Sequence, residues 1–198
     1  MLTKIKQRAQ SWLTSEAALL HRFGLKPNHI SVLGLILALF SALTYWQWKV
    51  NPIFLIVAPL LMLFSGLFDA LDGAVARIYR ENTEFGGFFD SLLDRYADAI
   101  ILIGIILGRL TDIIWGLIAL MGFLMVSYTR ARAEAAGVKM ESVGLAERAE
   151  RIVFLAAISF LSYFWFDTLN WGILIIAVLT NVTVIQRAIY FHKASQIN

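Results

Sequence analysis

Six apolar stretches, each about as long as a helix that crosses a bilayer, take up most of this sequence. A hydrocarbon core about 30 Å thick requires about 20 mostly apolar residues. The chain is 59% hydrophobic and only 16% charged, whereas a soluble domain carries about 25% charged residues. We therefore predict an all-α integral membrane protein, a single domain over residues 1–198 with a six-helix transmembrane bundle over residues 31–190. The predicted spans cover residues 31–48, 52–77, 85–107, 113–133, 148–166 and 169–190.

The segment before the first stretch has a different pattern. Over residues 2–24, apolar side chains such as Leu13, Leu20 and Phe23 recur at roughly helical spacing, with basic residues between them. This pattern predicts an amphipathic helix that lies in the membrane interface and that Gly24 would end. A disordered tail is the alternative. The segment has neither a compact apolar run nor a small-residue cleavage site, so we expect no cleavable signal peptide.

The basic residues are distributed unevenly along the chain. All but two of the 17 lysine and arginine residues fall in the N-terminal segment, around residues 77–95 and 130–151, or near the C-terminal end. The exceptions, Lys49 and Arg109, belong to connections on the other side of the predicted bundle. Because basic loops favour the cytoplasmic side, we expect a multi-pass protein of the cell membrane with both termini in the cytoplasm.

Five aspartates interrupt the second and third stretches close to the loop that joins them. Asp69 and Asp72 lie in the second stretch, and Asp90, Asp94 and Asp98 lie in the third. Residues three or four apart share a helical face, and the short connection makes the helices antiparallel, so the carboxylates should converge near the cytoplasmic surface. Acids inside a membrane are costly and mark functional sites. Oxygen ligands suit Mg²⁺ or Mn²⁺, and four such carboxylates are enough for two ions.

Besides metal binding, the sequence leaves two roles open for these acids. The acids could form buried ion pairs with Arg77 and Arg95, although acids outnumber the nearby bases. They could also form the ion pathway of a divalent-cation transporter. However, the outer halves of the two stretches, residues 52–68 and 100–107, are almost entirely apolar. Acids that stop near the inner surface favour a pocket over a pore. Asp98 extends the acidic stripe by one turn without an evident role.

The residues around these acids form a motif. It reads Asp69-Ala-Leu-Asp72-Gly73-Ala-Val-Ala76-Arg77, then eight residues, then Gly86-Gly-Phe-Phe-Asp90-Ser-Leu-Leu-Asp94. This run resembles the complete signature of the CDP-alcohol phosphotransferase family, whose members also have six transmembrane helices after an interfacial one. The resemblance implies an enzyme in which an alcohol attacks the β-phosphorus of a CDP-linked lipid and CMP leaves.

The resemblance also implies roles for the motif residues. The ligands of the divalent cations would be Asp69, Asp72, Asp90 and Asp94, with Asp90 shared between two ions. Asp94 would also accept the proton of the attacking hydroxyl. The positions that match contacts to the CDP-lipid are Asn28, Ser31, Gly73, Arg77, Thr83 and Gly86. For the first two of these, capping of a helix N-terminus is an equal alternative.

A second polar cluster comes from the last three stretches. Arg130 lies near the end of the fourth, Arg151 near the start of the fifth, and Arg187 within the sixth between apolar neighbours. Guanidinium groups that meet at one depth suit bidentate capture of a phosphate, which an acceptor that is itself a phosphate ester would supply. Arg132 and Arg148 are instead expected to form surface ion pairs with neighbouring glutamates.

The order of these residues is similar to that in the inositol-phosphate-using branch of the family. The pattern is Ser127-Tyr-Thr-Arg130-Ala-Arg132-Ala-Glu134, then Glu147-Arg148-Ala-Glu150-Arg151, then Gln186-Arg187. It implies that the phosphate of 1L-myo-inositol 1-phosphate is bound by Ser127, Arg130, Arg151 and Arg187. Arg130 and Ala149 stand where bacterial members carry Lys and Pro, so either CDP-archaeol or CDP-diacylglycerol fits as donor. Glycerol 3-phosphate is the alternative acceptor, and members of the family are commonly homodimers.

Overall fold

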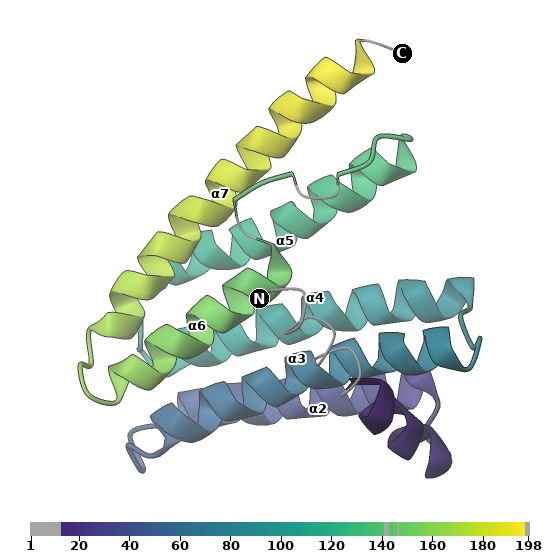
Figure 1. Cartoon of the computed structure of the whole chain (residues 1–198). Helices are drawn as coiled ribbons and strands as arrows, with labels where there is room; N and C mark the ends of the chain where they lie inside the picture. The colour runs from purple at the N-terminus through teal and green to yellow at the C-terminus, as the bar shows by residue number, and fades with distance from the viewer. Residues whose placement is uncertain (1–12, 141–142, 146, 197–198) are drawn as a thin grey trace, which may run out of the picture.

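The computed structural model describes residues 13–140, 143–145 and 147–196 and contains only helices and their connections within that part. Each long helix follows one of the predicted stretches, and successive helices run antiparallel (Figure 1). The fold class is therefore confirmed as all-α. The long helices are α2 (Pro27–Trp46), α3 (Phe54–Ile78), α4 (Glu84–Leu107), α5 (Ile113–Ala135), α6 (Arg148–Ser162) and α7 (Thr168–Ser195).

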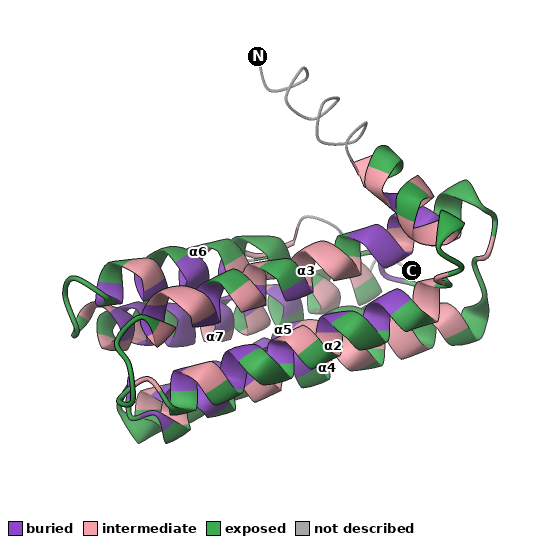
Figure 2. Cartoon of the chain, turned by 90° about the horizontal axis from the view of Figure 1, so that it is seen from below, coloured by how far each residue is buried: buried purple, intermediate pink, exposed green. Residues whose placement is uncertain are grey.

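The helices pack in two groups, α2 with α3 and α4, and α5 with α7, which α6 and the α4–α5 contact join. Helix α2 lies against α3 and α4, helix α5 lies against α4 and α7, and α6 contacts both α3 and α7. Buried residues recur along each helix between exposed ones (Figure 2), as expected when one face packs inward. The α2–α4 contact depends on small residues: a Cβ atom added to Gly104 would lie 2.5 Å from the Ala42 Cα. Close helix approach through small residues is typical of packing in membranes.

The outer surface of the bundle is apolar. Large side chains such as Phe40, Phe64, Leu117 and Trp171 are each about half exposed or more, at 53%, 51%, 53% and 62% respectively. Helices α2, α3, α5 and α7 are long and apolar enough to cross a bilayer. Helix α4 carries several acids and an arginine in its first half, and α6 has only 15 residues. Both helices carry charged residues of the candidate site, Asp90 and Asp94 on α4 and Arg148 and Arg151 on α6.

The N-terminal segment is described only from residue 13, so residues 2–12 of the predicted interfacial helix lie outside the described residues. Residues 13–22 are helical, and Gly24 ends this helix with a φ of +79°, as predicted. The helix packs against α2 and α3, with Ala17 buried in one cluster with Ile30 of α2 and Val75 of α3. Helix α2 begins at Pro27, four residues before the predicted start at residue 31, because proline suits the first position of a helix.

Candidate active site

Three carboxylates meet where α3 and α4 face one another. Asp69 and Asp72 are three residues apart on α3, and Asp90 lies two turns into α4. One carboxylate oxygen from each of the three lies within 4.8 Å of the others. This convergence was predicted from the helical spacing. Three carboxylate oxygens so close together repel one another, and they match the oxygen ligands that a hard divalent cation prefers.

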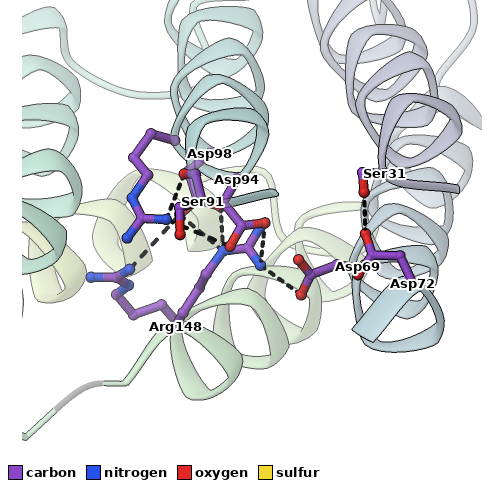
Figure 3. Close-up of polar contacts among 9 residues, drawn as sticks. Ser31, Asp69, Asp72, Ser91, Asp94, Asp98 and Arg148 are labelled. Carbon is purple, nitrogen blue, oxygen red and sulfur yellow. Dashed lines mark hydrogen bonds and ion pairs between the residues drawn. The ribbon is translucent and has the colours of Figure 1, made fainter. Parts of the chain in front are cut away.

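Asp72 is the most deeply buried of these three acids, with 3% of the residue exposed. The Ser31 hydroxyl of α2 donates to its Oδ2 atom over 2.5 Å (Figure 3). Lys26 is the N-cap of α2, and both Asn28 and Ser31 lie within the helix, so the alternative that either residue caps it is wrong. The early start of α2 at Pro27 is the reason. Ser31 therefore joins α2 to the acidic cluster.

Arg148, the first residue of α6, lies among the acids of α3 and α4 (Figure 3). Its Nη1 atom is 2.9 Å from both Asp69 Oδ2 and Asp94 Oδ1, and its Nε atom is 3.3 Å from Asp98 Oδ1. The prediction that Arg148 forms a surface pair with a neighbouring glutamate is wrong. Half-buried carboxylates attract a guanidinium more strongly than solvated glutamates do, because water screens the exposed pair.

The alternative in which Arg77 and Arg95 neutralise the acids is not the arrangement observed. Arg95 reaches Asp94 only at 3.8 Å, and its Nη1 atom donates to the Ser91 carbonyl. Arg77 forms no ion pair within the part of the chain that the structure describes. Its guanidinium instead lies over Gly73, where an added Cβ atom would be 3.0 Å from Nη1. Arg148 is the main cation of the cluster.

A cavity of about 210 Å³ opens on one side of the acids, between the first turns of α2 and the α3–α4 connection. Asp72 and Asp90 form its inner wall. Thr83, the N-cap of α4, accepts a hydrogen bond from the Gly86 N–H over 2.9 Å. All six positions that the family resemblance links to the CDP-lipid line this cavity: Asn28, Ser31, Gly73, Arg77, Thr83 and Gly86.

A second cavity, of about 340 Å³, opens on the other side of the acids. Asp94 and Arg148 lie in its wall. The four residues predicted to bind an acceptor phosphate also line it: Ser127, Arg130, Arg151 and Arg187. The sequence therefore predicted correctly that these side chains, from α5, α6 and α7, come together. The acidic cluster lies between the two cavities.

The arginines of the second cavity differ in their partners. Arg187 is buried, and its Nε and Nη1 atoms donate to the carbonyls of Val143, over 2.8 Å, and Val126. Arg130 is partly exposed and pairs with Glu134 over 2.9 Å. Arg151 is 3% exposed, yet its Nε and Nη1 atoms have no hydrogen-bond partner within the described residues. Buried donors are nearly always satisfied, so two unpaired N–H groups beside a cavity are suited to an oxyanion.

Sequence reasoning missed the position of Arg148 in the site and the arginine partners of Asp98. Arg148 lies three residues before Arg151 at the start of one helix, and this spacing puts both on one face. Asp98 likewise continues the face of Asp90 and Asp94 by one turn. These two spacings were the available signal. They do not show which of the neighbouring acids Arg148 would contact.

The chain is similar to proteins of known activity along most of its length. The family profile described as CDP-alcohol phosphatidyltransferase matches residues 25–183. Archaetidylinositol phosphate synthase of Methanothermobacter thermautotrophicus is 44% identical over 172 residues, which cover 85% of this chain and 84% of that protein.

Two crystal structures of phosphatidylinositol phosphate synthase from Mycobacterium tuberculosis have the same fold. The structure with CDP-DAG bound superposes with a TM-score of 0.80 at 31% identity, covering 90% of this chain and 92% of that chain. The complex with manganese and citrate gives a TM-score of 0.81, also at 31% identity, covering 90% of this chain and 88% of that chain.

Proposed function

The chain belongs to the CDP-alcohol phosphatidyltransferase family, and we propose that it transfers the phospholipid part of a CDP-lipid to inositol 1-phosphate. The products are CMP and a lipid with an inositol phosphate head group. The observation that carries this proposal is the arginine-lined cavity that opens directly onto Asp94. A neutral acceptor alcohol would not require a set of guanidinium groups, whereas a phosphate ester would.

The donor belongs in the cavity lined by the first turns of α2 and the α3–α4 connection. Arg77 is the cation nearest to Gly73 in that cavity, so its guanidinium is suited to a phosphate of the CDP group. Gly73 has no side chain to fill the space beside it. The relatives support this donor, because one of their structures contains CDP-DAG. Both CDP-archaeol and CDP-diacylglycerol fit, since the head group is the same.

Asp69, Asp72 and Asp90 would hold a divalent cation, Mg²⁺ or Mn²⁺, because their oxygens already converge within 4.8 Å. When bound, such an ion neutralises charge on the pyrophosphate and on the leaving phosphate. A second ion held by Asp90 and Asp94 is part of the proposal. Arg148 Nη1 lies 2.9 Å from Asp94 Oδ1, so this ion would bind the other oxygen of Asp94 unless the guanidinium group moves. The manganese complex of the mycobacterial relative supports the choice of metal.

The acceptor belongs in the arginine cavity, with its phosphate on Ser127, Arg130, Arg151 and Arg187. Asp94 lies in the wall between this cavity and the acidic cluster. A carboxylate there can take the proton of the attacking hydroxyl as its oxygen bonds to the β-phosphorus. The bond from that phosphorus to the CMP oxygen then breaks, and CMP leaves with the electron pair.

We further propose that all six long helices cross the membrane and that the site faces the cytoplasm. Helix α6 is short, but the apolar residues that follow it, Phe164 and Trp165, are exposed at 71% and 67% and suit a membrane boundary. Among the basic residues that the structure describes, only Lys49 and Arg109 belong to connections at the end of the bundle away from the site. The helix over residues 13–22 would lie in the interface. The homodimeric state common in the family is part of the same proposal.

Purified protein tests this function through release of CMP. The assay contains CDP-archaeol or CDP-diacylglycerol, Mg²⁺ or Mn²⁺, and one acceptor at a time: inositol 1-phosphate, free inositol, glycerol 3-phosphate or serine. We expect turnover with inositol 1-phosphate and little with free inositol, because the arginine cavity recognises the phosphate. Turnover with glycerol 3-phosphate but not with inositol 1-phosphate would show that the acceptor is wrong while the reaction class is right.

A further inference from the structure

Asp98 is an acid inside the bundle that the reaction described above does not use. It lies one turn beyond Asp94 on α4, and only 6% of the residue is exposed. It is not among the acids whose oxygens converge for a cation. Both of its carboxylate oxygens accept from Arg148 Nε, at 3.3 and 3.4 Å (Figure 3). Its Oδ2 atom also lies 3.8 Å from Arg151 Nη2. Asp98 thus faces the arginines rather than the metal-ligand set.

The contacts of Arg151 determine which of its donors stay free. Nη2 is directed to Asp98, and the guanidinium carbon lies 4.3 Å from the centroid of the Phe123 ring. The Asp98 contact, at 3.8 Å, is a charge interaction longer than a hydrogen bond, and together with the ring contact it favours one orientation of the planar guanidinium group. The remaining donors, Nε and Nη1, are buried without a partner within the described residues. Asp98 and Phe123 therefore favour an orientation of Arg151 in which Nε and Nη1 stay available for an oxyanion.

Charge gives a second reason for an acid at this position. The arginine cavity brings Arg95, Arg130, Arg148, Arg151 and Arg187 to one wall region. Buried like charges repel one another unless an acid offsets them. Arg187 is bonded to carbonyls, and Arg130 pairs with a partly exposed glutamate. Asp98 is the acid that Arg148 and Arg151 share.

We propose that Asp98 is a positioning residue for the acceptor phosphate, which holds Arg151 and Arg148 in the orientation that the phosphate requires. The inference rests on the proposed function, since it assumes an acceptor with a phosphate in the arginine cavity. Asp98 acts through the two arginines and touches neither the CDP-lipid nor the reacting atoms. Its loss should therefore affect the acceptor far more than the donor.

The test is Asp98→Asn, which keeps the size of the side chain and removes its charge. We expect the KM for inositol 1-phosphate to rise by about tenfold or more, a loss of about 1.4 kcal/mol. The KM for the CDP-lipid should stay within about twofold, and kcat should change less than the acceptor KM. Asp112→Asn is the matched control: Asp112 caps α5 at the opposite end of α4 from the site, and asparagine caps a helix equally well. The control should leave both KM values unchanged.

A double variant separates positioning from a general structural role. Each single variant raises the acceptor KM by some factor. If Asp98 acts through Arg151, the factor for Asp98→Asn/Arg151→Ala will be at least about threefold smaller than the product of the two single factors. Independent, multiplicative effects would overturn the proposal. So would an unchanged acceptor KM in Asp98→Asn, or an equal rise in both KM values. If Asp98→Asn does not fold, Asp98→Glu takes its place: the carboxylate is displaced by one methylene, and the same selective rise is expected.

The proposed function can fail separately. If wild-type protein releases no CMP with inositol 1-phosphate, the choice of acceptor is wrong, and the same variants are measured with glycerol 3-phosphate, which also carries a phosphate. A selective rise in the KM for that acceptor would still support the role of Asp98. An unchanged KM would overturn it.

Discussion

The Nη1 atom of Arg148 lies 2.9 Å from Asp94 Oδ1 and 2.9 Å from Asp69 Oδ2. A single guanidinium group therefore joins α6 to both helices of the acidic cluster. It also lies in the wall of the arginine cavity, so the residue that balances the acids belongs to the acceptor side of the site. Substitutions in the arginine cavity should consequently affect the acidic cluster, and substitutions in the cluster should affect the cavity.

Replacement of Arg148 tests this coupling. Arg148→Ala leaves Asp69, Asp94 and Asp98 without their main counter-charge, so the metal-free protein should melt at a lower temperature. A bound cation would relieve that repulsion, so Mn²⁺ should raise the melting temperature by several degrees more in the variant than in wild type. Thermal unfolding in detergent with and without Mn²⁺ measures the difference. Arg109→Ala, at the opposite end of α4, is the control, and an equal Mn²⁺ effect in both variants would contradict the prediction.

Asp94→Asn tests the proton acceptor. An amide cannot accept the hydroxyl proton, so kcat should fall by a hundredfold or more, given the roughly 10²–10⁴-fold contribution of a general base. Asp94 does not line the cavity proposed to bind the CDP-lipid, between α2 and the α3–α4 connection. Binding of the CDP-lipid should therefore change by only a few fold. CMP release gives kcat, and a titration with the CDP-lipid gives its affinity. A kcat within tenfold of wild type would remove Asp94 from this role.

Arg151→Ala tests the acceptor pocket. The variant loses the two unpaired buried donors, so the KM for inositol 1-phosphate should rise by tenfold or more, as expected for charge-assisted hydrogen bonds. The KM for the CDP-lipid should stay the same. Arg109→Ala again serves as the control, because it removes a guanidinium group from the far end of the bundle. A large loss of CDP-lipid affinity in Arg151→Ala would place this arginine on the donor instead.

The helix packing makes a prediction about stability. Gly104→Ala would place a Cβ atom 2.5 Å from the Ala42 Cα. This is a steric clash, and because the contacted atom belongs to the backbone of α2, the helices would have to move apart to relieve it. We expect a loss of about 1–3 kcal/mol from the strain. At Gly66 the same substitution meets only the Ile152 side chain, at 3.8 Å, so Gly66→Ala should be neutral. Melting temperatures of the two variants make the comparison, and equal values would refute the assigned α2–α4 contact.

The helices could be predicted from the sequence because apolar runs and their breaks are local features. Even so, α2 begins at Pro27 rather than at the predicted residue 31, because its first residues are polar and the prediction followed hydrophobicity. Helix α6 ends at Ser162, before the predicted residue 166, because the predicted span followed hydrophobicity beyond the helix. The contact of α2 with both α3 and α4 depends on how closely backbones approach at Gly104. The distance between two helices leaves no periodic pattern in the sequence, so this contact could not be predicted from it.

The candidate site could likewise be predicted only in part. The spacings of three and four residues grouped Asp69 with Asp72 and Asp90 with Asp94, and the structure places them together. The partner of Arg148 could not be predicted, because its nearest acids in sequence are glutamates of its own helix start. Its actual partners are 50 to 79 residues away in the chain. Only the packing of α6 against α3 shows that pairing.

A competition experiment tests the central claim most directly. Wild-type protein receives a CDP-lipid, Mn²⁺, and equal concentrations of inositol 1-phosphate and glycerol 3-phosphate, and mass spectrometry measures the two lipid products at early times. Their ratio equals the ratio of the two kcat/KM values. We predict that the inositol phosphate lipid exceeds the glycerophosphate lipid by at least tenfold. A mixture in which the glycerophosphate lipid predominates would contradict the assignment of inositol 1-phosphate as the acceptor.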